Sequence, residues 1–152
     1  VQAQQSKSTP RWDELLGLQM NAEVQAFVEV MIGRLFYPIK VSDNWQICLM
    51  VKGIGGTGKG TFVSIVKAMF PELDVGTITA NFEKTFGLQA IHQKRLVTIP
   101  DMPKRFSKVL NQQTFQSMVS GDDVSVPCKH GQALPNIPWR AHCLIASNHW
   151  MD

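Results

Sequence analysis

The chain has 152 residues, of which 44% are hydrophobic and 18% are charged, and this balance excludes a disordered segment and favours one domain with its own core. No apolar run approaches the ~20 residues of a membrane-spanning helix, and residues 1–10 are polar and unlike a signal peptide, so no membrane role is expected. The formal charge of +3 is too small to indicate whether the chain binds nucleic acid. Cys48, Cys128 and Cys143 lack metal-ligand spacing and favour a reducing compartment.

The first part of the chain is predicted to be helical. Residues 1–11 are rich in Gln and Ser and are predicted to be a disordered lead-in or linker. Residues 12–44 are predicted to be a helical segment, because apolar residues recur from Asn21 at spacings of three and four up to Tyr37 and Pro38. This stripe is interpreted as a packing surface without a ligand role. It consists of Val24, Phe27, Val28, Met31, Ile32 and Leu35.

The rest of the chain, residues 45–152, is predicted to be an α/β core with a mostly parallel sheet flanked by helices. The segments that read as strands are residues 45–51, 95–99 and 142–146. The segments that read as helices are residues 62–70, residues 81–93 with Gly87 as an interruption, and residues 114–119, closed by Gly121. Residues 124–131 read as a strand that leads into a hairpin tip.

A glycine-rich run, GIGGTGKGT at residues 53–61, lies between the first strand and the helix that follows it. Such a loop turns its backbone N–H groups toward phosphate oxygens, and the helix adds its positive N-terminal end. Lys59 would reach the outer phosphates, so the sequence predicts a nucleoside triphosphate site. The residues expected to form it are Gly53, Gly55, Gly56, Thr57, Gly58, Lys59, Gly60 and Thr61.

One position departs from the common form of this loop. Gly60 stands where Ser or Thr normally holds Mg²⁺, and Thr61 is the nearest hydroxyl. Either Thr61 takes that role, or the metal is held through water and carboxylates.

Three polar residues follow the three predicted strands: Lys59, Asp101 and Asn148. If the strands are parallel neighbours, these residues converge at one edge of the sheet, where ligands of α/β proteins bind. There Asp101 would hold Mg²⁺, directly or through water, and Asn148 would orient the attacking water or sense the outermost phosphate.

The chain resembles superfamily 3 helicases over about residues 46–148. The resemblance lies in the phosphate loop, in the strand that ends at Asp101, in the run SGDDVSV at residues 120–126 followed by Lys129 and His130, and in the strand that ends at Asn148. The GKGT form of the loop and the Ser-Asn-His ending lean toward the primase-helicases of large DNA viruses and phages.

The resemblance implies an AAA+-like P-loop ATPase core that uses ATP and Mg²⁺ and assembles as a hexameric ring. It implies that the ring moves along single-stranded DNA during viral or phage genome replication in an infected cell, with a fused or associated primase. Lys59 and Thr61 would contact phosphates and metal, Asp101 would be the magnesium-associated acid, and Asn148 the sensor. Lys129 and His130 would form a hairpin tip that touches DNA in the central channel.

Two features depart from the family pattern. Pro100 precedes Asp101 where many relatives have a second acid, so the residue that activates water is open, with Glu83 and Asp122 as substitutes. No arginine follows Asn148, so the sequence is expected to be an excerpt that ends before the arginine finger.

Two rival functions stay open at this point. A nucleoside monophosphate kinase can carry the same loop, although it needs an arginine-rich lid, and the stretch after Asp101 has only Arg105 before Arg140. A non-catalytic module that assembles on ATP binding is the other rival. For Lys129 the alternative is a solvated turn, and the basic run that includes Lys104 and Lys108 is interpreted as a solvated helix face or subunit contact.

Overall fold

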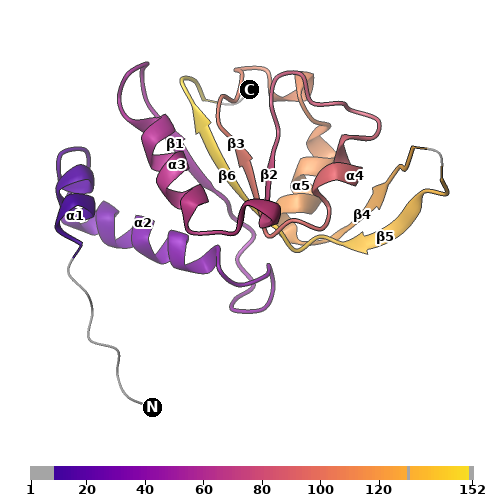
Figure 1. Cartoon of the computed structure of the whole chain (residues 1–152), viewed down its shortest axis with the longest axis horizontal. Helices are drawn as coiled ribbons and strands as arrows, with labels where there is room; N and C mark the ends of the chain where they lie inside the picture. The colour runs from indigo at the N-terminus through magenta and orange to yellow at the C-terminus, as the bar shows by residue number, and fades with distance from the viewer. Residues whose placement is uncertain (1–8, 130, 151–152) are drawn as a thin grey trace, which may run out of the picture.

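A parallel sheet of four strands organises the chain. The computed structural model describes residues 9–129 and 131–150. The strands of the sheet are β1 (Leu49–Lys52), β2 (Val75–Thr77), β3 (Leu96–Ile99) and β6 (His142–Ser147). Their order is β1-β6-β3-β2, and all neighbours run parallel (Figure 1). Every residue of β3 and β6 is buried, as expected for central strands of a parallel sheet covered on both faces.

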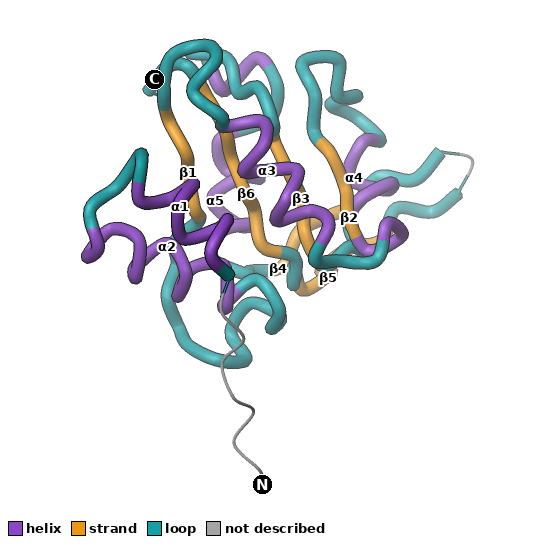
Figure 2. The backbone as a smooth tube through the Cα atoms, turned by 60° about the vertical axis from the view of Figure 1, so that its left-hand side comes forward, coloured by secondary structure: helices purple, strands orange, loops and turns teal. Residues whose placement is uncertain are grey.

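Helices cover both faces of the sheet, and the chain therefore has the predicted α/β class. Figure 2 shows α3 in front of the strands and α5 behind them. The helices are α1 (Pro10–Gly17), α2 (Ala22–Arg34), α3 (Lys59–Ala68), α4 (Gly87–Ile91) and α5 (Gln112–Ser120), with short 3-10 turns η1 (Glu72–Asp74) and η2 (Phe106–Lys108). A separate antiparallel hairpin consists of β4 (Asp123–Val126) and β5 (Leu134–Pro138).

Alternating side chains of the central strands divide the core into two clusters. In β6, Leu144 and Ala146 join α1, α2 and α3, while Cys143 and Ile145 join α4, α5 and the hairpin. This alternation is the period of two that a strand imposes on its side chains. The N-terminal helices therefore share a core with the sheet. Among the described residues, no helix is both long enough and apolar enough to cross a membrane.

Helix α1, helix α4 and strand β2 differ from the sequence predictions. Helix α1 begins at Pro10, inside the segment predicted as a linker, because proline is well suited to the first helical turn and Trp12 stacks on Phe62 with 5.8 Å between ring centroids. Residues 1–8 of that segment lie outside the described residues. Helix α4 begins at Gly87, which was predicted to interrupt it. Strand β2 was not predicted, since three residues are too short for a periodic signal.

The predicted apolar stripe on α2 is only partly buried. Val28, Met31, Ile32 and Leu35 are buried, but the side chains of Val24 and Phe27 are 43% and 51% exposed. Helix α2 lies at one side of the molecule (Figure 1), and the part of the stripe that reaches the core is limited to these four buried side chains.

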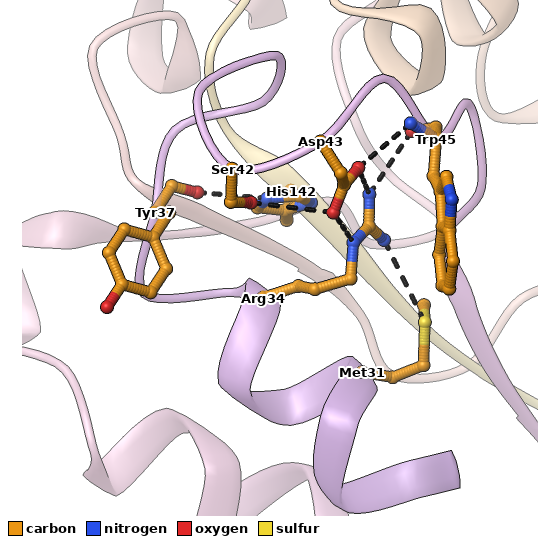
Figure 3. A network of polar contacts seen from close by, with 7 residues as sticks. All are labelled: Met31, Arg34, Tyr37, Ser42, Asp43, Trp45 and His142. Carbon is orange, nitrogen blue, oxygen red and sulfur yellow. Dashed lines mark hydrogen bonds and ion pairs between the residues drawn. The ribbon is translucent and has the colours of Figure 1, made fainter.

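A buried arginine fixes the chain between α2 and β1. Arg34 is 8% exposed and donates to both carboxylate oxygens of Asp43, at 2.6 and 2.8 Å, and to the carbonyl of Trp45 at 3.2 Å (Figure 3). Its guanidinium lies 5.4 Å from the centre of the Trp45 ring. Because these contacts hold Trp45 in a loop, β1 begins at Leu49 and not at residue 45, where the strand was predicted.

The same network sets the ionisation of two groups. Hydrogen bonds from Arg34 and from the Trp45 N–H lower the pKa of Asp43 to about 2. Burial, with the nearby charge of Arg34, lowers the pKa of His142, whose Nε2 lies 3.0 Å from the carbonyl of Tyr37. His142 is the first residue of β6, so the network ties the end of α2 to the amino end of a central strand (Figure 3).

Candidate nucleotide-binding site

The glycine-rich loop connects β1 to α3, as the sequence predicted. Gly56 and Gly58 have φ values of 81° and 85°, in the left-handed region that favours glycine. Gly58 is the N-cap of α3, so the chain turns directly from the loop into the helix. Gly55 and Gly60 are exposed, which leaves the backbone of the loop accessible to a ligand.

The start of α3 is open to an anion. The first-turn N–H groups of a helix have no partner within the helix, and here no described side chain caps them. The first turn also has no acidic residue among its described positions, and Thr61 is exposed there. These features favour a phosphate group at this position.

Lys59 closes the loop from within. Its ammonium donates to the carbonyls of Gly53 and Ile54, both at 2.7 Å, and its side chain is half-buried. The hydroxyl of Thr57 donates to the same Ile54 carbonyl at 2.9 Å. Since an ammonium binds a phosphate oxygen more strongly than a neutral carbonyl, Lys59 can exchange these partners for an anionic ligand.

Hydrogen bonds join the carboxyl ends of the three strands that carry the predicted site residues. The N–H of Gly53 donates to the carbonyl of Ser147 at 3.2 Å, and the N–H of Met102 donates to the carbonyl of Ala146 at 2.9 Å. Gly53 follows β1, Met102 follows Asp101, and Ser147 precedes Asn148. The structure therefore brings the loop, Asp101 and Asn148 to one edge of the sheet, as predicted from parallel neighbouring strands.

Ser147 was not predicted to have a role. Its hydroxyl donates to the carbonyl of Met102 at 2.7 Å and accepts from the N–H of His149 at 3.0 Å, and the residue is 1% exposed. It thus fixes the backbone on both sides of Asn148 relative to Asp101. The position of Ser147 directly before Asn148 was the one sign of a role in the sequence. Its hydrogen-bond partner, the Met102 carbonyl, is 45 residues away and is seen only in the folded chain.

The donors at this edge suit a hydrated magnesium ion. Thr61 and Asp101 are exposed and offer oxygen ligands, which Mg²⁺ prefers. Within the described residues, no group of three or more His, Cys, Asp or Glu side chains could hold a metal. A single carboxylate, completed by water and substrate phosphates, is the arrangement that Mg²⁺ commonly adopts.

The two substitutes for the water-activating acid are engaged elsewhere. The carboxylate of Asp122 accepts from Lys40 at 2.8 Å, and its carbonyl accepts from Trp139, which precedes the amino end of β6. Asp122 therefore lies at the edge opposite the glycine-rich loop, and its proposal as a catalytic base is wrong. Glu83 lies 3.6 Å from the ammonium of Lys129.

Lys129 lies at the tip of the β4–β5 hairpin and packs against α4 and the segment before it. Its side chain is 57% exposed, with its ammonium 5.8 Å from the centre of the Phe86 ring, and its N–H donates to Gln89 Oε1 at 3.0 Å. His130 lies outside the described residues. Figures 1 and 2 place this hairpin away from the glycine-rich loop, so the structure separates the predicted DNA-binding residue from the phosphate site.

The chain matches one family model and several solved structures. Residues 51–152 match the model described as "Family of unknown function (DUF5906)". No curated protein matches the chain. The apo structure of the NrS-1 C-terminal region (305–718) has a TM-score of 0.71 and 18% identity, over 97% of this chain and 36% of that one. The A form of the same region has a TM-score of 0.66 and 17% identity, over 99% and 35%.

The TM-scores show that this chain shares its fold with these structures. Because the sequence identities are only 18% and 17%, the matches show the fold and not a function. The chain spans about a third of the length of the solved structures that it matches.

Replacing Ser147 by alanine should loosen the site edge. The change leaves the Met102 carbonyl without its buried donor, which costs about 1–3 kcal/mol in the free energy of unfolding. Ser125→Ala, on an exposed position of β4, is the matched control and should change stability by less than about 0.5 kcal/mol. Urea unfolding measures both, and equal stability of the two variants would show that the Ser147 hydroxyl does not hold the strand ends together.

Proposed function

The chain belongs to DUF5906, a family of unknown function, and from its site we propose that it is the ATPase core of a superfamily 3 DNA helicase. The observation that carries this proposal is the loop between β1 and α3. Lys59 donates to two carbonyls of this loop, and the N–H groups at the start of α3 have no side-chain cap. A loop of this form on a parallel strand is typical of P-loop nucleotide sites. The AAA+-like character of the core is part of the same proposal.

Each residue at the edge has a role that its position supports. Lys59 would give up the Gly53 and Ile54 carbonyls and bind the outer phosphates. Asp101 and Thr61 would hold Mg²⁺, directly or through water, and this ion supplies positive charge to the phosphates when bound. Asn148 would orient the attacking water, on a backbone fixed by Ser147.

The proposed partners follow from the resemblance and from the hairpin. Lys129 is an exposed cation at a hairpin tip and would contact the phosphates of single-stranded DNA. The working form would be a hexameric ring with a fused or associated primase, and its setting would be viral or phage genome replication in an infected cell. Such a ring places ATP between subunits, where a neighbour can supply an arginine finger.

Removing the Lys59 ammonium tests the nucleotide site. Lys59→Ala should lower the affinity for ATP by about tenfold to a hundredfold, because a hydrogen bond to a charged group contributes about 1.5–3 kcal/mol. The fold should remain, since a half-buried loop lysine adds little to the core. Nucleotide titration and circular dichroism measure these effects, with Lys67→Ala in the last turn of α3 as the control. Unchanged ATP affinity in Lys59→Ala would refute the phosphate-loop assignment.

Removing the Lys129 ammonium tests the helicase against both rivals. In the full-length protein, Lys129→Ala should weaken single-stranded DNA binding, while ATP affinity stays unchanged. The log–log salt slope of DNA binding should fall by about 0.7 for each DNA phosphate that the lysine no longer neutralises. A kinase or an assembly module would show no such defect.

The ion pair of Lys129 offers a matched control. Glu83→Gln removes the same ion pair from the other side and leaves the lysine free, so DNA binding should be retained or strengthened. If both variants weaken DNA binding equally, Lys129 acts by holding the hairpin on the segment before α4, and its role as a DNA contact is wrong.

A further inference from the structure

A cationic hollow lies at the amino edge of the parallel sheet, opposite the glycine-rich loop. Three positive side chains line it and come from the starts of two neighbouring strands, since Lys94 and Arg95 precede β3 and Arg140 precedes β6. The rest of its described lining contains no carboxylate and consists of Leu35, Tyr37 and Pro38, from the end of α2 and the loop that follows. Figure 1 shows this loop below the sheet, at the end where β6 begins.

Backbone hydrogen bonds fix these segments side by side. The N–H of His142 donates to the carbonyl of Arg95 at 3.2 Å, which joins the starts of β6 and β3. The N–H of Ile39 donates to the carbonyl of Arg140 at 3.1 Å, which joins the loop after α2 to the start of β6. The three cations are therefore brought together by the fold, from positions that are far apart in the sequence.

The positive charge of the hollow is only partly neutralised within the described part of the chain. Arg95 donates to the carbonyl of Phe36 at 3.0 Å and lies 3.6 Å from the carboxylate of Asp74. Lys94 donates to a backbone carbonyl at 2.7 Å. The exposed side chain of Arg140 has no hydrogen bond or ion pair with another described residue. One carboxylate thus faces three cations, and the hollow favours an anion.

The size of the hollow and its aromatic wall indicate the kind of anion. Its volume is about 40 Å³, close to the ~30 Å³ of one water molecule in the liquid, so it can take a phosphate oxygen but not a free nucleotide. The ring of Tyr37 is 56% exposed and points away from His142, which holds the Tyr37 carbonyl (Figure 3). Cations beside an exposed aromatic ring are the usual composition of a surface that binds single-stranded nucleic acid.

We propose that the amino-edge patch, which consists of the three cations and Tyr37, binds the phosphate backbone of single-stranded DNA at a second place, separate from the hairpin tip. The inference rests on the proposed function, which makes DNA the partner of this chain. The hairpin carries Lys129 at its tip, and only Trp139 separates the end of β5 from Arg140. A strand that contacts both places would follow the hairpin from its tip to its base, away from the nucleotide.

Removing one charge from the patch tests the inference in the full-length protein. Arg140→Gln should lower the affinity for single-stranded oligothymidine by about threefold to tenfold at low salt, and the log–log salt slope by about 0.7, because one phosphate contact is lost. The variant should fold, since the Arg140 side chain is exposed and the backbone bond to Ile39 is kept. Arg140→Lys keeps the charge and should keep the slope. Arg11→Gln, the same change at an exposed position of α1, is the matched control and should change neither quantity in a fluorescence anisotropy titration.

A change of the aromatic ring separates the bases from the phosphates. Tyr37→Leu should weaken the binding of oligothymidine but not of an abasic strand of the same length, because only the first can stack a base on the ring. Equal weakening of both strands would show that Tyr37 acts by holding the loop after α2, and its role as a base contact would be wrong.

The outcomes separate this inference from the proposed function. If the unmodified protein binds no single-stranded DNA, the proposed function is wrong, and the amino-edge patch is wrong with it. If Lys129→Ala weakens DNA binding and Arg140→Gln does not, only the patch is wrong. A loss of ATP affinity in Arg140→Gln as large as its loss of DNA affinity would also overturn the patch, because the change would then act through the fold.

Discussion

The buried hydroxyl of Ser147 is the contact on which the candidate site depends. It binds the backbone after β3 and the turn after β6, while the Ser147 carbonyl binds the start of the glycine-rich loop. Parallel strands alone bring their carboxyl ends to one edge, but they leave the residues beyond each end free to diverge. The Ser147 contacts remove that freedom, so Lys59, Asp101 and Asn148 stay at one edge before any ligand binds.

The loop is held in shape by contacts that a ligand can replace. Lys59 and Thr57 both donate to the Ile54 carbonyl, so the loop is closed by its own polar groups. A triphosphate would compete with neutral carbonyls for the ammonium, and this exchange favours the anion. On the other side, the hydrogen bond from Arg34 to the Trp45 carbonyl ties the helical segment to the chain before β1, and the stacking of Trp12 on Phe62 ties it to α3. Thr57, Gly58 and Lys59 of the loop also face α1 and its turn across a small cavity.

The sequence predicted those features that depend on short-range pattern. The loop, β3, β6, α5 with Gly121 in the left-handed region, and the hairpin all follow from continuous apolar runs or from glycine spacing. The features it could not predict depend on residues far apart in the chain. Trp45 is kept out of β1 by Arg34, Asp122 is held at the opposite edge by Lys40, and Lys129 pairs with Glu83. The cavity at Met20 likewise exists only because α1 packs beside a loop that begins at Gly53.

The most direct test is a crystal structure of the protein with Mg²⁺ and a non-hydrolysable ATP analogue. We expect the phosphates to lie in the loop and Lys59 to have left the Gly53 and Ile54 carbonyls for phosphate oxygens. An analogue bound elsewhere, with Lys59 still on both carbonyls at millimolar ligand, would contradict the proposed nucleotide site.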